Sequence, residues 1–145
     1  MNKKVLLLLL TLIMAFSVCA AAEADISVEL NGQVLAFDVP PQLINDRTMV
    51  PMRAIFENLG ANVEWIDAHE LIIATKGVNI ITMQIGSNNM IIQDVVANEQ
   101  QVIELDVPPQ VIDDRTLVPV RAIAEGLSAT VEWVDETQTV VIKTK

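Results

Sequence analysis

The second half of this chain repeats the first half. Residues 38–67 and 106–135 align without a gap, and about two-thirds of their positions are identical, which is far beyond chance at this length. A duplicated segment is expected to build the same unit twice, so the fold of one copy constrains most of the chain. We expect a duplicated domain over 25–145, with tandem copies at about 26–76 and about 94–145 joined by connecting strands in 77–93.

Turn signals recur at equivalent places in the two copies. Asn31-Gly32 lies between two segments in which apolar and polar residues alternate, a pattern that predicts a β-hairpin. The pairs Asn45-Asp46 and Asp113-Asp114 each precede a short apolar segment, and both residue types tolerate the left-handed conformation of tight turns. Short antiparallel strands are therefore expected in each copy.

A short helix is predicted in the middle of each copy. Pro51 and Pro119 suit the first position of a helix, where a fixed φ and a missing N–H are tolerated. Gly60 stands where the first helix should end in the left-handed conformation, and Ser128 takes that place in the second copy at a cost of roughly 1 kcal/mol. These signals together predict an α+β fold of short antiparallel strands with one short helix per copy, in two tandem copies.

Residues 1–24 have the three-part pattern of a secretory signal peptide. A positively charged start is followed by an apolar run from Val5 to Val18 and then by small residues up to Ala24. The run is shorter than the ~20 residues of a membrane-spanning helix, so we expect cleavage after Ala20 or Ala24 and no membrane span afterwards. An uncleaved N-terminal anchor is the alternative. The expected location is secreted, either extracellular or associated with the cell wall.

The chain is acidic and poor in the side chains that bind metals. Its 19 Asp and Glu residues outnumber its 9 Lys and Arg residues, and the formal net charge of −10 makes nucleic acid an unfavourable partner. Cys19 is the only cysteine, His69 is the only histidine, and tyrosine is absent. We therefore expect no high-affinity transition-metal site and no cofactor.

The repeated segment resembles a known family. Its two versions read PPQLINDRTMVPMRAIFENLGANVEW and PPQVIDDRTLVPVRAIAEGLSATVEW. This motif is similar to that of the copper amine oxidase N-terminal domain family, also called the stalk domain, and the resemblance extends from about Ile26 to Lys143. It implies secretion, typically by Gram-positive bacteria, and a twisted antiparallel sheet wrapped around a helix. In amine oxidases this domain is a stalk remote from the catalytic centre, so the resemblance implies no oxidase activity.

The residue inventory argues against catalysis. An amine oxidase needs a tyrosine for its quinone cofactor and three histidines for copper, and this chain cannot supply them. A glycosidase needs only two carboxylates, and Glu57, Glu64, Glu125 and Glu132 recur in both copies. A duplicated carboxylate is better explained by a duplicated structural role, and a lone turn histidine such as His69 is usually solvated. We predict that the protein is not an enzyme.

Two pairs of repeated residues are the candidates for ligand binding. Trp65 and Trp133 could stack on a sugar ring if they were exposed, but each shares a strand face with a valine, which favours a place in the core. Arg47 and Arg115 could form part of an anion site, or could bond carbonyls or carboxylates within their own copy. For both pairs the structural role is the favoured interpretation.

These observations predict a non-catalytic, secreted, stalk-type structural or interaction module at the cell envelope. The expected partner is a cell-envelope component or another protein. The alternative is a carbohydrate-binding module that holds cell-wall glycan with Trp65 and Trp133. A small hydrolase with carboxylate catalysis is the third possibility, and it would require two facing carboxylates in a cleft.

Overall fold

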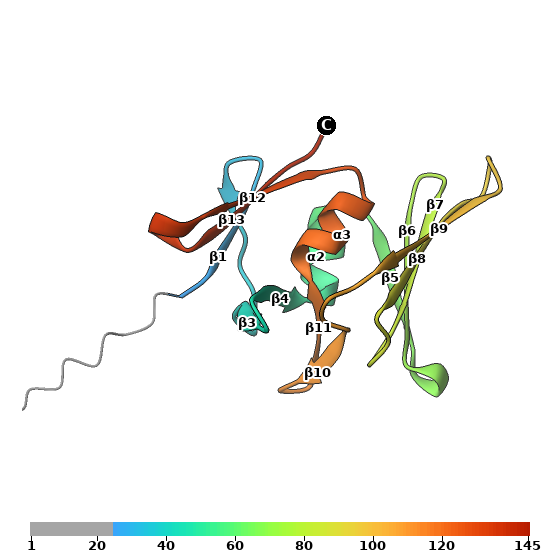
Figure 1. The fold of residues 1–145 in the computed structure, drawn as a ribbon, viewed down its shortest axis with the longest axis horizontal. Helices are drawn as coiled ribbons and strands as arrows, with labels where there is room; N and C mark the ends of the chain where they lie inside the picture. The colour runs from blue at the N-terminus through green and yellow to red at the C-terminus, as the bar shows by residue number, and fades with distance from the viewer. Residues whose placement is uncertain (1–24) are drawn as a thin grey trace, which may run out of the picture.

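A computed structural model describes residues 25–145 (Figure 1). The expected signal peptide, residues 1–24, lies outside the described residues. Within the described part no helix is long and apolar enough to cross a membrane. In chain order the elements are β1 (Ser27–Leu30), β2 (Gln33–Val34), β3 (Gln42–Ile44), β4 (Arg47–Pro51), α2 (Met52–Asn58), β5 (Asn62–Ile66), η1 (Asp67–His69), β6 (Leu71–Lys76), β7 (Asn79–Gln84), β8 (Asn89–Asp94), β9 (Glu99–Glu104), β10 (Gln110–Ile112), β11 (Arg115–Pro119), α3 (Val120–Gly126), β12 (Thr130–Val134), η2 (Asp135–Thr137) and β13 (Thr139–Lys143).

The expected α+β fold, with a twisted sheet around one short helix in each of two tandem copies, is wrong. The described residues are 50% strand and 17% helix. Their strands form three sheets, and the two α-helices lie between the two outer sheets (Figure 1). The physical reason is strand pairing between the copies. A short amphipathic strand can bury its apolar face against any partner that offers a free edge, and here the partner comes from the other copy.

The central sheet joins the two copies symmetrically. Its strand order is β10-β11-β4-β3, so the β3–β4 hairpin of the first copy meets the β10–β11 hairpin of the second through β4 and β11. These two strands are antiparallel, and Val50 pairs with Val118, its equivalent in the repeat. A position that pairs with its own equivalent marks a local twofold axis, as in an isologous interface between two identical subunits.

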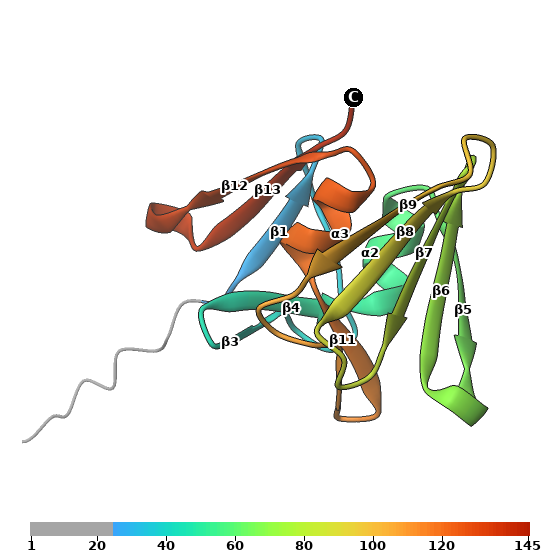
Figure 2. The ribbon, with the colours of Figure 1, turned by 45° about the vertical axis from the view of Figure 1, so that its right-hand side comes forward.

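Each outer sheet is built from both copies. One sheet has the order β12-β13-β1-β2, in which β1 of the first copy runs parallel to β13 of the second (Figure 2). The other has the order β5-β6-β7-β8-β9, in which β8 and β9 extend the sheet begun by β5 and β6 of the first copy. The copies therefore exchange their first hairpins. The sheets differ because β7 lies between β6 and β8, whereas β13 pairs directly with β1.

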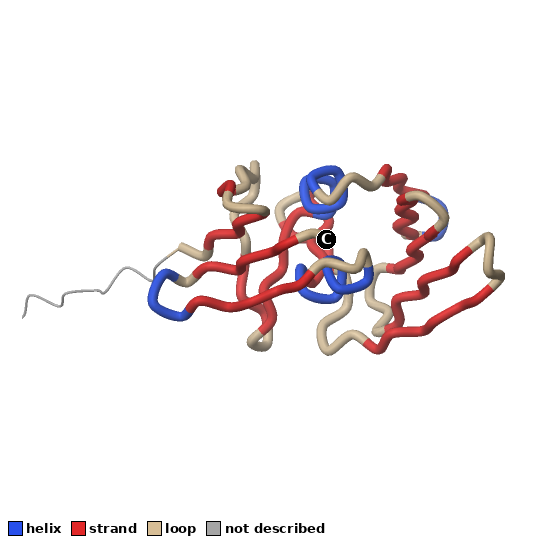
Figure 3. The backbone as a smooth tube through the Cα atoms, turned by 90° about the horizontal axis from the view of Figure 1, so that it is seen from above, coloured by secondary structure: helices blue, strands red, loops and turns tan. Residues whose placement is uncertain are grey.

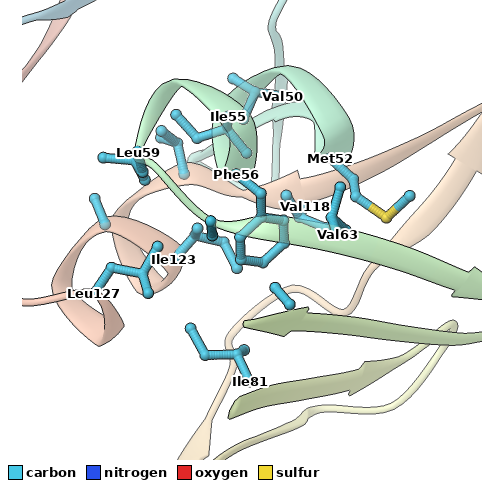
Figure 4. Packing of buried hydrophobic residues seen from close by; sticks show 14 of the residues in the cluster. Val50, Met52, Ile55, Phe56, Leu59, Val63, Ile81, Val118, Ile123 and Leu127 are labelled. Atoms are coloured by element: carbon cyan, nitrogen blue, oxygen red, sulfur yellow. The ribbon is translucent and has the colours of Figure 1, made fainter. Parts of the chain in front are cut away.

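The helices and the core lie between the outer sheets (Figures 1 and 3). Phe56 of α2 is fully buried and points toward Ile123 of α3, with Ile81 of β7 on the far side of the ring (Figure 4). The large core cluster draws buried residues from all three sheets and both helices. A second, smaller cluster of Met49, Val107 and Leu117 also draws on both copies. The core is therefore shared, and neither copy has a core of its own.

Local signals in the sequence appear where they were expected. Pro51 and Pro119 are the last residues of β4 and β11, and each is followed at once by a helix. Asn45 and Asp46 both have positive φ, at 47° and 62°, which forms the tight turn between β3 and β4. Ser128 ends α3 in the left-handed conformation with φ 64°, so the helix end of the second copy keeps the backbone of the first despite the absent glycine.

Candidate functional site

Two ion pairs connect the copies reciprocally. The Nε atom of Arg47 donates to Oδ2 of Asp106 at 2.8 Å, and Nε of Arg115 donates to Oδ2 of Asp38 at 2.6 Å. Asp38 and Asp106 are equivalent positions in the two copies, as are Arg47 and Arg115. The same contact is therefore made twice, once in each direction between the copies. Each arginine also donates to a carbonyl of its own copy, as expected: Nη1 of Arg47 to Asp46 and Nη1 of Arg115 to Asp114, both at 3.2 Å. The carboxylate partners, however, lie in the other copy, because the central sheet places each arginine beside it.

The Arg115–Asp38 ion pair changes the pKa of its carboxyl group. The hydrogen bond from Arg115, helped by its positive charge, lowers the pKa of Asp38 below its usual value of 3.8. Both side chains are about half exposed, at 50% and 56%. Asp38 is therefore ionised at neutral pH, and solvent screens much of the attraction between the two charges.

Of the two tryptophans, for which a place in the core was favoured, Trp133 is exposed, whereas Trp65 is partly buried and packs against the large core cluster. Trp133 is 38% exposed, and Trp65 is half-buried at the margin of the large core cluster. Both lie on edge strands, β12 and β5, where no further strand covers them. Phe56 and many Ile, Val, Leu and Met side chains fill the shared interior, and Trp65 packs against it from the margin.

Each indole is held by a local hydrogen bond. Nε1 of Trp133 donates to Oδ1 of Asp135 at 3.3 Å, and Nε1 of Trp65 donates to Oδ1 of Asp67 at the same distance. Gln138 also donates to Oδ1 of Asp135, at 3.3 Å. These bonds satisfy the polar edge of each ring and orient the ring without covering its face.

The four candidate residues come together in two grooves. Groove one, of about 600 Å³, contains Trp133 from the second copy with Arg47 from the first. Groove two, of about 650 Å³, contains Trp65 from the first copy with Arg115 from the second. Groove one is lined by Leu43, Asp46, Arg47, Thr48, Asp106, Pro119, Val120, Arg121, Val131, Glu132, Trp133, Asp135, Gln138 and Val140. Groove two is lined by Asp38, Pro51, Met52, Arg53, Ala54, Glu57, Trp65, Asp114, Arg115 and Thr116.

The grooves are equivalent under the local twofold axis. Eight of the ten residues that line groove two have their repeat equivalents in groove one, whereas groove one adds an exposed leucine, Leu43, and the amide of Gln138. Leu43 is 55% exposed and lies across the groove from the second-copy strand β12. Groove one therefore offers the larger apolar surface beside its indole.

Charge in the grooves argues against an anion site. Groove one has four carboxylates against two guanidinium groups, an excess of two negative charges, and groove two has three against two, an excess of one. The guanidinium groups are also engaged within the protein, since Arg121 and Arg53 pair with Glu125 and Glu57 at 3.3 and 3.5 Å. A phosphate or carboxylate ligand would meet net repulsion in either groove.

Of the other residues considered from the sequence, Glu132 lines groove one, and the rest are already paired or lie outside the two grooves. Glu57 and Glu125 belong to the helix pairs, as their spacing suggests, and Glu64 lies on β5 as an exposed residue. His69 lies in η1 and is exposed. Within residues 25–145, no group of three or more His, Cys, Asp or Glu side chains is placed to hold a metal ion.

Sequence reasoning overlooked the aspartates of the grooves. Asp38 and Asp106 open the two DVPP segments, and each stands at the same place in its copy as the other. A repeated aspartate and a repeated arginine in one short segment were a signal for an ion pair. The signal could not reveal that each pair crosses to the other copy, because that depends on how β4 meets β11.

Comparison with known proteins identifies the family. The family description "copper amine oxidase N-terminal domain" matches residues 29–144, which includes every residue named in the two grooves. A search among curated proteins found no match to the chain. The matched domain is a non-catalytic, stalk-like part of the copper amine oxidases. Because the match covers most of the chain, this protein belongs to the copper amine oxidase N-terminal domain family.

Proposed function

We propose that this protein is a non-catalytic, stalk-type module that is exported to the cell envelope and binds cell-wall glycan in its two grooves. The observation that carries the proposal is the exposed indole of Trp133, which is fixed by Asp135 at the side of a groove. Sugar rings stack on exposed aromatic faces, while planar polar groups around them bond the hydroxyls. Groove one supplies both kinds of group.

The polar lining suits hydroxyl recognition. The Arg47–Asp106 pair, the amide of Gln138 and the Asp135 carboxylate lie in groove one with Trp133. Each group combines donors or acceptors whose orientation is restricted by a neighbour, so a ligand hydroxyl meets an arrangement that is already ordered. Ordering before binding lowers the entropic cost of association.

The same groups are poorly suited to catalysis. A glycosidase needs one carboxylic acid that stays protonated, and an apolar environment usually provides it. In groove one Asp106 is paired with Arg47, and Asp135 accepts hydrogen bonds from Trp133 and Gln138. Both carboxylates are therefore already engaged as hydrogen-bond acceptors within the protein. Binding without turnover is therefore the function that the groove supports best.

Export is the part of the proposal that depends on residues 1–24. Their charge, apolar run and small residues support cleavage after Ala20 or Ala24 and release to the outside of the cell. N-terminal sequencing of protein recovered from the culture medium tests this directly. Recovery of intact Met1 in a membrane fraction would contradict it.

Glycan binding is tested with a matched pair of variants. We expect wild-type protein to sediment with purified cell-wall sacculi, and Trp133→Ala to lose most of that retention while its melting temperature stays close to the wild-type value. Val96→Ala is the control, since Val96 is 77% exposed and lines neither groove. Equal retention of Trp133→Ala and wild type, or no retention of wild type, would overturn the proposal.

A further inference from the structure

We infer that groove one selects glycans that carry a free, protonated amino group over neutral and anionic glycans. The inference rests on the proposed function, because it names the chemical class of sugar that this site takes. The ligand is an amino sugar whose nitrogen is not acetylated. Three observations on groove one carry it: unpaired carboxylates, a partly exposed indole and guanidinium groups that are already paired with carboxylates.

Two carboxylates of groove one have no ion-pair partner among residues 25–145. Asp46 and Glu132 both line the groove and are exposed, and neither forms an ion pair with another residue of the described chain. By contrast, Arg47 is paired with Asp106 and Arg121 with Glu125. The charge left for a ligand to meet is therefore negative, and the complementary ligand is a cation.

The indole adds a second attraction for a cation. Trp133 is exposed on the edge strand β12, and tryptophan is the aromatic side chain that attracts a nearby cation most strongly. The Trp133 ring can stack on a sugar through its apolar face while the amino group of the same sugar meets the negative charge of the groove. One residue of an amino sugar thus uses both features of groove one.

The whole protein adds a long-range effect. The formal net charge of −10 attracts cationic polymers and repels anionic ones before contact. Anionic wall polymers are therefore disfavoured at both stages, the approach and the docking. Groove two has the smaller excess of negative charge and the less exposed indole, so we assign the stronger selectivity to groove one.

The test compares three oligosaccharides of one length on the purified full protein. These are a hexamer of glucosamine, a hexamer of N-acetylglucosamine and a hexamer of galacturonate, titrated at about pH 6, where amines of this type are largely protonated. Intrinsic tryptophan fluorescence or calorimetry gives each Kd. We expect glucosamine to bind about tenfold more tightly than N-acetylglucosamine at low salt, and galacturonate to bind most weakly. Added salt should reduce the preference.

A double variant tests which residues are responsible. Asp46→Asn with Glu132→Gln removes the two unpaired charges, and asparagine still tolerates the left-handed turn at position 46. The preference for the glucosamine hexamer over the N-acetylglucosamine hexamer should therefore fall to about twofold or less. Glu99→Gln with Glu104→Gln makes the same charge change on β9, outside both grooves, and should keep the preference.

The outcomes separate this inference from the proposed function. If the neutral hexamer binds as tightly as the cationic one, or galacturonate binds most tightly, the selectivity is wrong although glycan binding stands. If none of the three hexamers binds, both the proposed glycan binding and the selectivity are wrong. Tighter binding of a lysine tetrapeptide than of the glucosamine hexamer would overturn the assignment to a sugar.

Discussion

Val50 of β4 lies directly opposite Val118 of β11, and both are fully buried. The two valines hold the same position in the two copies, so the local twofold axis of the molecule passes between them. From this axis follow the crossed ion pairs, the exchanged hairpins and the two equivalent grooves. The molecule is organised like a dimer whose subunits are joined in one chain.

The exchanged hairpins predict that neither copy folds alone. A chain of residues 25–87 would lack β13, the partner of β1, and would expose the central core on which both helices pack. We expect such a half-chain to show no cooperative unfolding transition by circular dichroism. Mixing it with residues 88–145 should restore strand signal, because the missing edges are then supplied. A sharp melting transition for either half by itself would contradict the exchange.

Ser128→Gly should stabilise the protein. Ser128 has φ 64° at the end of α3, a conformation that glycine adopts without the steric cost that serine carries. The added freedom of glycine in the unfolded chain offsets part of the gain, so we expect a net increase of about 0.5–1 kcal/mol in the free energy of unfolding. Urea denaturation measures it. Gly60→Ser is the matched reverse change and should lower stability by a similar amount.

The pKa of Asp38 should depend on Arg115 and not on Arg47. The hydrogen bond from Arg115 holds this pKa below 3.8, so the pair contributes stability above the ordinary aspartate pKa and loses it as pH falls through the lowered folded-state value. In Arg115→Met the pKa of Asp38 should rise toward 3.8. An NMR titration of the Asp38 carboxyl carbon reports it. Arg47→Met should leave the pKa of Asp38 unchanged, since Arg47 pairs with Asp106.

The two tryptophans should differ in fluorescence and in their effect on stability. Trp65→Phe leaves the exposed Trp133 as the only emitter, and its emission should be red-shifted and readily quenched by acrylamide. Trp133→Phe leaves the half-buried Trp65, whose emission should be bluer and better protected. Trp133→Ala should cost well below the ~3–5 kcal/mol of an emptied aromatic core site. A loss in that range would place Trp133 in the core after all.

Some features of this protein follow from the sequence alone. The repeat motif identified the family, and the match over residues 29–144 confirms it. The turn at Asn45-Asp46 and the helix starts after Pro51 and Pro119 were also predictable. These features depend on the conformational limits of a few neighbouring residues, and such limits act before any tertiary contact forms.

The tertiary structure decided the rest. Only the pairing of Val50 with Val118 brings Arg47 to Asp106 and places Trp133 beside a first-copy arginine. The edge position of β12, which leaves Trp133 exposed, goes with β13 pairing with β12 along one edge and with β1 of the first copy along the other. Two similar copies offer similar strand edges, so local sequence cannot distinguish pairing within a copy from pairing between copies. The shared core determines which strands pair, because it is complete only when both copies contribute to it.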